Sequence, residues 1–187
     1  MREFTDLESF IAFLEVLPIE VREAAPLGLE AGAVLIEHKA KGMLGTYQSG
    51  SGEFPAWEPL RQETQLKRDD WGYSVDQPEL VTTDLRDHIQ RIVDRSALEA
   101  AVGVPNLEVG DHDDPKGNPH TRYRNIGEVA AAQELGLHGL PQRSFLGLSC
   151  ALFGGEVVDL MSYPVIAAIC GMPTPALISP EAHEIPF

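Results

Sequence analysis

A short helix with its own start and stop signals, at residues 125–136, constrains the fold more than any other stretch of this sequence. Asn125 can cap the helix, and Glu128 stands at the capping-box position three residues later. Gly136 can adopt the left-handed conformation in which many helices end. The sequence therefore predicts a helix that is closed at both ends.

The segment at residues 140–147 follows this helix and is predicted to be extended. It carries Pro141, Arg143 and Phe145, which are a stiff residue, a cation and an aromatic ring. Nothing in the segment is typical of a catalytic site, and we interpret it as an arm that lies against a neighbouring molecule. The alternative is an internal role, in which Arg143 and Phe145 pack within their own domain.

The net charge of −15, from 29 acidic and 14 basic residues, argues against a protein that grips nucleic-acid phosphates. Such binding relies on Lys and Arg, which displace the counterions of the phosphates. Solubility is the simplest explanation of the charge, although an acidic surface also lets DNA pass nearby without binding. The length of 187 residues and the hydrophobic share of 43% fit one globular domain.

The two cysteines and the apolar regions favour a protein made in the cytoplasm. Cys150 and Cys170 are predicted to be small buried hydrophobes, because neither belongs to a Cys-x-x-Cys pair. The acidic N-terminus lacks the basic region of a signal peptide. Glu156 and Asp159 interrupt the most apolar region, so we predict no membrane span.

The first helix is predicted at residues 5–17. Thr5 and Glu8 form a capping box there. Apolar residues then recur at the helical spacing, at Leu7, Phe10, Ile11, Leu14 and Leu17. We expect Pro18 to end this helix, because proline removes a helical hydrogen bond.

A second helix is predicted at residues 19–44, with a bend at Pro26 and an end at Gly45. Gly28 and Gly32 lie one turn apart within it. Small residues at this spacing allow another helix to approach closely, so we expect core or interface packing along this face.

The middle of the chain predicts a small antiparallel sheet. Thr83 is expected to cap a helix that runs through Ile92. Short strands are expected at residues 91–94 and 97–104, with a turn at residues 95–96.

The apolar region at residues 145–170 is predicted to be broken into pieces. Gly154 and Gly155 punctuate it, and Pro164 follows nine residues later. We therefore expect a short helix, a strand at residues 156–160 and another short apolar piece.

The predicted fold class is α+β, with N-terminal helices packed on a small antiparallel sheet. We expect one domain over residues 1–170, with long loop insertions at residues 46–80 and 105–124. Residues 171–187 contain four prolines and are expected to form an extended tail.

One cluster of polar residues raises an alternative, metal-dependent function. It consists of Asp111, His112, Asp113, Asp114 and His120, whose side chains are possible ligands of a divalent cation. The cluster lies in a Gly/Pro-rich loop without a rigid element to hold it. We therefore predict no metal, no cofactor and no catalytic residue, and keep a metal-dependent hydrolase as the alternative.

Large aromatic residues occur in the predicted loops, at Trp57, Trp71, Tyr73 and Tyr123. Such side chains often anchor in the pocket of a partner protein. For Trp57 the alternative is that it folds back onto its own domain, because Pro55 and Pro59 stiffen its loop.

Five motifs in the same order resemble the neck or tail-completion proteins of long-tailed bacteriophages, a family also described as virion morphogenesis or minor tail proteins. The motifs lie at residues 40–48, 54–64, 78–89, 101–104 and 132–146, and include Phe54-Pro55-Ala56-Trp57, Ala132-Gln133-Glu134-Leu135-Gly136 and Leu140-Pro141-Gln142-Arg143-Ser144-Phe145. The chain departs from the family pattern at Thr82-Thr83, where family members generally carry Thr-Gly.

The resemblance implies a structural virion protein without enzymatic activity. Such a protein forms a ring of six or twelve copies at the head-to-tail junction, between the portal, connector or head-closure protein and the tail terminator or tail tube. It is assembled in the host cytoplasm, and DNA passes nearby without specific binding. The candidate interface residues are Trp57, Leu60, Arg86, Glu134, Pro141, Arg143 and Phe145.

Overall fold

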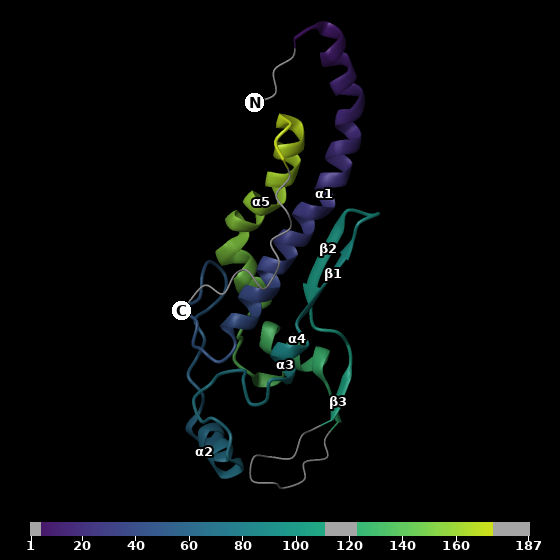
Figure 1. Ribbon diagram of the computed structural model, residues 1–187. Coiled ribbons are helices and arrows are strands. Elements are labelled where there is room, and N and C mark those ends of the chain that lie inside the picture. The colour runs from purple at the N-terminus through teal and green to yellow at the C-terminus, as the bar shows by residue number, and fades with distance from the viewer. Residues whose placement is uncertain (1–4, 111–122, 174–187) are drawn as a thin grey trace. The chain divides into compact units, whose positions relative to one another are not determined.

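The computed structural model of the protein describes residues 5–110 and 123–173 (Figure 1). Its elements are α1 (Leu7–Met43), α2 (Gln62–Trp71), α3 (Asp84–Asp87), β1 (Gln90–Asp94), β2 (Glu99–Gly103), β3 (Glu108–Gly110), β4 (Tyr123–Asn125), α4 (Ile126–Leu135), the 3-10 helix η1 (Leu137–Gly139) and α5 (Leu146–Cys170). Two long helices and small two-stranded sheets make the fold α+β, as the sequence predicts.

The chain divides into two compact units, and α1 and α5 each pass through both. The first, which we call the two-helix unit, comprises Met1–Leu35, Arg91–Ala101 and Phe153–Phe187. The second, which we call the mixed unit, comprises Ile36–Gln90 and Val102–Leu152.

α1 is one continuous helix, so the prediction of two helices separated at Pro18 is wrong. Pro18 and Pro26 both lie inside it. Each proline removes one helical hydrogen bond, but the residues on both sides of Pro18 favour a helix, so the ladder resumes in the next turn. Gly45 follows the end of α1 with a φ of 96°, a conformation that glycine adopts without strain.

α5 is also one helix, which overturns the predicted helix, strand and short piece. Gly154, Gly155 and Pro164 are all helical, and no strand forms at residues 156–160. The physical reason is the packing of α5 along α1, because most helical stability in proteins comes from such contacts rather than from intrinsic propensity.

Small residues let α1 and α5 approach closely within the two-helix unit. A Cβ atom added at Gly28 would overlap the backbone carbonyl of Met161, and one at Gly32 would lie 2.8 Å from Cγ of Met161. Gly32 also faces Val157, so the two helices run antiparallel and side by side (Figure 1). The predicted close approach of a helix at Gly28 and Gly32 is confirmed.

The two-helix unit buries only small residues and prolines in its described part. These are Ala24, Pro26, Gly28, Gly32, Ala33, Pro164, Ala167 and Ala168. Every large apolar side chain there keeps part of its surface accessible to solvent, so the helices meet along a narrow seam rather than around a wide core.

The hairpin of β1 and β2 confirms the two predicted strands and the turn between them. The carboxylate of Asp94 accepts hydrogen bonds from the backbone and hydroxyl of Ser96 and from the backbone of Ala97, a local pattern that stabilises turns. These bonds, led by the one from the Ser96 hydroxyl, lower the pKa of Asp94. The predicted helix through Ile92 is wrong, because α3 ends at Asp87 and Ile92 belongs to β1.

The mixed unit has a core of large side chains. Its fully or nearly fully buried apolar residues include Leu44, Trp57, Leu60, Leu85, Ile89, Ile126, Phe145 and Leu148. α2 lies inside the region predicted as a loop at residues 46–80, and β3 pairs antiparallel with β4.

α4 confirms the helix predicted at residues 125–136. The side chain of Asn125 accepts hydrogen bonds from the backbone N–H groups of Gly127 and Glu128, at 3.0 and 3.2 Å. Gly136 ends the helix with a φ of 67° in the left-handed region, so both signals act as the sequence indicates.

Candidate functional site

The predicted arm at residues 140–147 lies inside the mixed unit, where a buried ion pair holds Arg143. Nη1 of Arg143 donates to Oε1 of Glu79 at 2.9 Å, and Nη2 donates to the backbone carbonyl of Glu58 at 3.0 Å. The side chains of Arg143 and Glu79 are only 7% and 4% exposed. Burial raises the pKa of Glu79, and the charge of Arg143 opposes that shift.

Glu134, at the end of α4, caps the first turn of α5. Its carboxylate accepts hydrogen bonds from the hydroxyl of Ser144 and from three successive backbone N–H groups. The N–H groups are those of Phe145, Leu146 and Gly147, at 2.9, 3.0 and 2.8 Å. A negative charge at this position also interacts favourably with the helix dipole.

The aromatic residues of the site pack internally as well. The indole Nε1 of Trp57 donates to the backbone carbonyl of Ser144 at 3.2 Å, and its side chain is nearly fully buried. Phe145 has no exposed surface. The structure therefore favours the internal alternative for Trp57, Arg143 and Phe145, and replaces the interpretation of residues 140–147 as a free arm.

The remaining predicted interface residues differ in exposure. Leu60 is buried, whereas Pro141 is partly exposed at the edge of the same region. The side chain of Arg86, in α3, is 41% exposed and lies 3.8 Å from the carboxylate of Asp87. The structure thus places six of these residues around one buried network in the mixed unit: Trp57, Leu60, Glu134, Pro141, Arg143 and Phe145. Arg86 belongs to the same unit but takes no part in that network.

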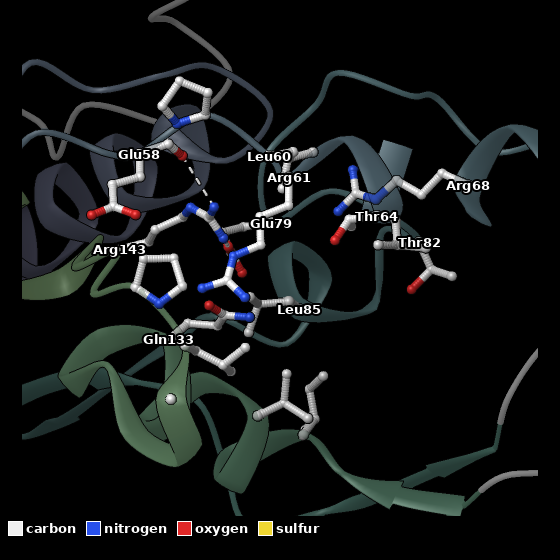
Figure 2. Close-up of a pocket in the computed structure, with 17 residues that line it drawn as sticks. Glu58, Leu60, Arg61, Thr64, Arg68, Glu79, Thr82, Leu85, Gln133 and Arg143 are labelled. Atoms are coloured by element: carbon white, nitrogen blue, oxygen red, sulfur yellow. Dashed lines mark hydrogen bonds and ion pairs between the residues drawn. The ribbon is translucent and has the colours of Figure 1, made fainter. Parts of the chain in front are cut away.

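A pocket of about 290 Å³ opens beside this network, lined by residues of α2, α3, α4 and the segments between them (Figure 2). Three arginines line it, Arg61, Arg68 and Arg143. Arg68 is buried and donates from Nη1 to the backbone carbonyl of Gln77 at 2.6 Å. Burial lowers the pKa of Arg68, and the positive charge of Arg143 acts in the same direction.

Two buried polar atoms at this pocket lack a partner among the described residues. They are Nε of Arg143, which is a donor, and Oε1 of Gln133, which is an acceptor. A buried polar atom without a hydrogen bond costs free energy, on the order of 1–3 kcal/mol. Three arginines and two glutamates, Glu58 and Glu79, line the pocket, and Glu79 is already paired with Arg143, so the remaining guanidinium groups favour an anion.

Sequence reasoning missed Glu79, Arg61, Arg68 and Gln133 as members of this site. Glu79 has a positive φ of 60°, and no local pattern predicts such a conformation for glutamate. Three of the 14 basic residues, Arg61, Arg68 and Arg143, meet in this pocket, but no local pattern in the sequence brings them together.

The two-helix unit presents a different kind of surface, on which large apolar side chains are exposed. On α1 the exposed large side chains are Leu7, Phe10, Ile11, Leu14, Val16 and Ile19, with exposed fractions of 40–70%. On α5 and just beyond it they are Val158, Tyr163, Ile166, Ile169 and Met172, at 39–63%. A groove of about 400 Å³ separates α1 from the C-terminal end of α5 and is lined by residues such as Glu20, Leu27 and Met172.

By length and composition alone, α5 could cross a membrane, and it is the one such helix in the described residues. Its most apolar stretch is only 17% buried. The sequence predicts no span because of Glu156 and Asp159, and both residues lie within this helix. Core helices of soluble proteins can meet the same criterion, so this finding is weak evidence for a membrane.

The residues of the alternative metal site, Asp111 to His120, lie outside the described part of the chain. Among the residues that the structure does describe, no group of three or more His, Cys, Asp or Glu side chains could hold a metal ion.

No family model matches the chain, and neither a curated protein nor a solved structure matches it. Function is therefore inferred from the geometry of this chain and from the motifs in its sequence.

Proposed function

We propose that this chain is a structural subunit of the phage head-to-tail junction, which assembles into a ring without catalysing a reaction. The observation that carries the proposal is the exposure of large apolar side chains in the described part of the two-helix unit. The order of motifs in the sequence supplies the link to neck and tail-completion proteins, and the acidic surface would let DNA pass without binding.

The apolar face of α1 continues past the end of α5. Leu7, Phe10, Ile11 and Leu14 recur at the helical spacing and fall on the same side of α1 as Gly28 and Gly32. No residue before Ala24 is buried in the described part of α1. The face that packs on α5 is therefore extended by a stretch whose large apolar side chains stay 40–70% exposed in the described part of the chain.

The exposed apolar side chains lie on one side of each helix. Leu7, Phe10, Ile11 and Leu14 share a side of α1 and are 40–70% exposed, and Val158, Ile166 and Ile169 share a side of α5 and are 48–63% exposed. Contiguous exposed apolar surface is typical of sites that contact another protein.

We assign the covering partner to a second copy of the chain. The N-terminal part of α1, at residues 7–23, contains four glutamates and one arginine, and α5 contains two acids and no base. Anionic lipid headgroups and DNA would be repelled, and two carboxylates in α5 make membrane insertion costly. Contact of α1 with the outer face of α5 in the next copy is head-to-tail, and such contacts close into rings.

A disulfide experiment tests this contact directly. Cys170 lies at the C-terminal end of α5 and is partly exposed. In a Cys150→Ser background, Ile11→Cys should form disulfides with Cys170 of the next copy. Non-reducing gels should then show a ladder of dimers, trimers and larger species that disappears on reduction.

The matched control is Ala12→Cys, which places the thiol on the side of α1 opposite its apolar face and should give little cross-linking. Dimers that stop at two copies and persist after Cys170→Ser would show a symmetric α1–α1 contact and overturn the head-to-tail assignment. Flotation of the chain with lipid vesicles, without self-association, would favour a membrane partner instead.

The place of the ring in a virion requires a separate measurement. Negative-stain images of the assembled protein should show closed rings of six or twelve copies with a central channel. Mass spectrometry of purified virions should detect the chain. Its absence from finished particles would contradict a structural role at the junction.

A further inference from the structure

We propose that the arginine pocket of the mixed unit binds a carboxylate side chain of a neighbouring copy of the chain. This inference rests on the proposed assembly but uses a different surface from the apolar helices. It assigns a ligand to the pocket that is lined by Arg61, Arg143 and Gln133.

The charges of the buried network leave Arg61 as the cation at the rim. Glu79 is paired with Arg143, and Arg68 is influenced by the charges of Glu79 and Asp76. Arg61 stands at the start of α2 and lines the pocket. Among the described residues, an added anion would therefore meet a guanidinium that forms no ion pair with a buried carboxylate and interacts only with the exposed Glu63.

The geometry of the pocket directs donors to one place. Figure 2 shows the guanidinium group of Arg61 turned into the pocket, toward Arg143 and Gln133. Arg143 is 6% exposed, and its Nε has no partner among the described residues. The backbone carbonyl of Glu58 accepts a hydrogen bond from Arg143, and Glu58 also lines the pocket (Figure 2). Arginine donors in this arrangement suit the two oxygens of a carboxylate.

The size and walls of the pocket fit an amino-acid side chain. Its volume of about 290 Å³ lies at the lower limit of the range for small-molecule sites. Leu60, Leu85 and Leu140 line it beside the arginines, so the methylene groups of a glutamate would contact apolar surface while its oxygens meet the guanidinium groups.

The chain itself supplies this ligand. It carries 29 acidic residues, so each copy presents carboxylates to its neighbours. In a ring, every arginine pocket would face a surface rich in acceptors, and charge-assisted hydrogen bonds would fix the register of the contact.

Thermal unfolding with two small probes tests the chemistry. N-acetylglutamate should raise the melting temperature of the full chain more than the isosteric N-acetylglutamine at equal ionic strength, because a ligand of the folded state stabilises it. Arg61→Ala should abolish the difference. Arg86→Ala, which removes an arginine that does not line the pocket, should preserve it.

Three results of this assay would overturn the assignment. They are equal shifts with the two probes, a difference that survives Arg61→Ala, and a larger Arg61-dependent shift with inorganic phosphate. The last result would identify a phosphate site instead of a carboxylate site.

Native mass spectrometry tests the source of the carboxylate. Arg61→Glu should weaken self-assembly at least tenfold, whereas Lys67→Glu, which reverses an exposed cation of α2 that does not line the pocket, should leave it unchanged. Normal assembly of Arg61→Glu, together with normal cross-linking of the Ile11→Cys variant through Cys170, would overturn this inference and leave the proposed ring intact. A chain that stays monomeric at every concentration, without cross-links, would overturn the proposed function.

Discussion

The two units of this molecule differ in the size of the side chains that they bury. The mixed unit buries Trp57, Phe145 and Leu148 and ties them to a network of charged and polar groups. The two-helix unit buries only alanine, glycine and proline in its described part, and leaves its large apolar side chains accessible. One unit buries its large side chains, and the other leaves them exposed.

This difference separates side chains that determine folding from side chains that are available for assembly. Substitutions in the buried network should change the free energy of unfolding. Substitutions on the outer faces of α1 and α5 should change association instead, since exposed positions have small effects on stability. Single substitutions in each unit can test that division.

The largest effect is expected for Glu134→Ala. This change removes the acceptor of four hydrogen bonds at the start of α5. We expect a loss of roughly 2–4 kcal/mol in the free energy of unfolding, because backbone N–H groups at a helix start lose their partner. Urea denaturation followed by circular dichroism measures it. Glu134→Gln keeps one acceptor oxygen without the charge and should lose less than Glu134→Ala; an unchanged free energy of unfolding in the glutamine variant would contradict the role of the charge.

A smaller effect is expected for Gly28→Ala in the two-helix unit. The added methyl group would overlap the carbonyl of Met161, which we expect to cost about 1–3 kcal/mol. Gly42→Ala is the matched control in the same helix, because nothing lies within 4 Å of its Cβ position. That variant should gain up to about 1 kcal/mol from helix propensity. The same sign for both changes in thermal unfolding would argue against the close seam.

The pH dependence of Glu79→Gln should be smaller still. Burial raises the pKa of Glu79 in the folded state above its ordinary value of 4.5. Its stabilising contribution is therefore fully present below that value and is lost as the pH rises through the folded-state pKa. Relative to the non-titrating variant, the wild type should lose stability over this window, as urea titrations at several pH values would reveal. An increase would mean that the ion pair with Arg143 outweighs burial.

The smallest effect on stability is expected for Leu14→Ser, on the uncovered face of α1. We expect a change within about 0.5 kcal/mol in the free energy of unfolding. Sedimentation velocity should nevertheless show weaker self-association. A marked loss of monomer stability would show that Leu14 packs within its own chain.

The sequence predicted the local elements with strong signals. The cap at Asn125, the stop at Gly136 and the turn after Asp94 each depend on neighbouring residues, and all three are present in the structure. The close approach at Gly28 and Gly32 was also predicted, because small residues at a helical spacing have few other uses.

The sequence misled where packing decides between conformations. Pro18, Pro164 and the pair Gly154-Gly155 are ordinary breakers, yet each lies inside a long helix. The site was predicted only in part, because Arg143 and Phe145 were recognised as important but their burial depends on Glu79, which is distant in the sequence. A local pattern cannot reveal such a pairing.

The burial of Arg143 has a consequence for proteolysis. It is the last lysine or arginine in the sequence, so trypsin can release residues 144–187 intact only by cutting after it. Its side chain is fixed by Glu79 and by the carbonyl of Glu58. A protease must therefore wait for this part of the mixed unit to open, and the rate at which the fragment appears would report the opening without any label.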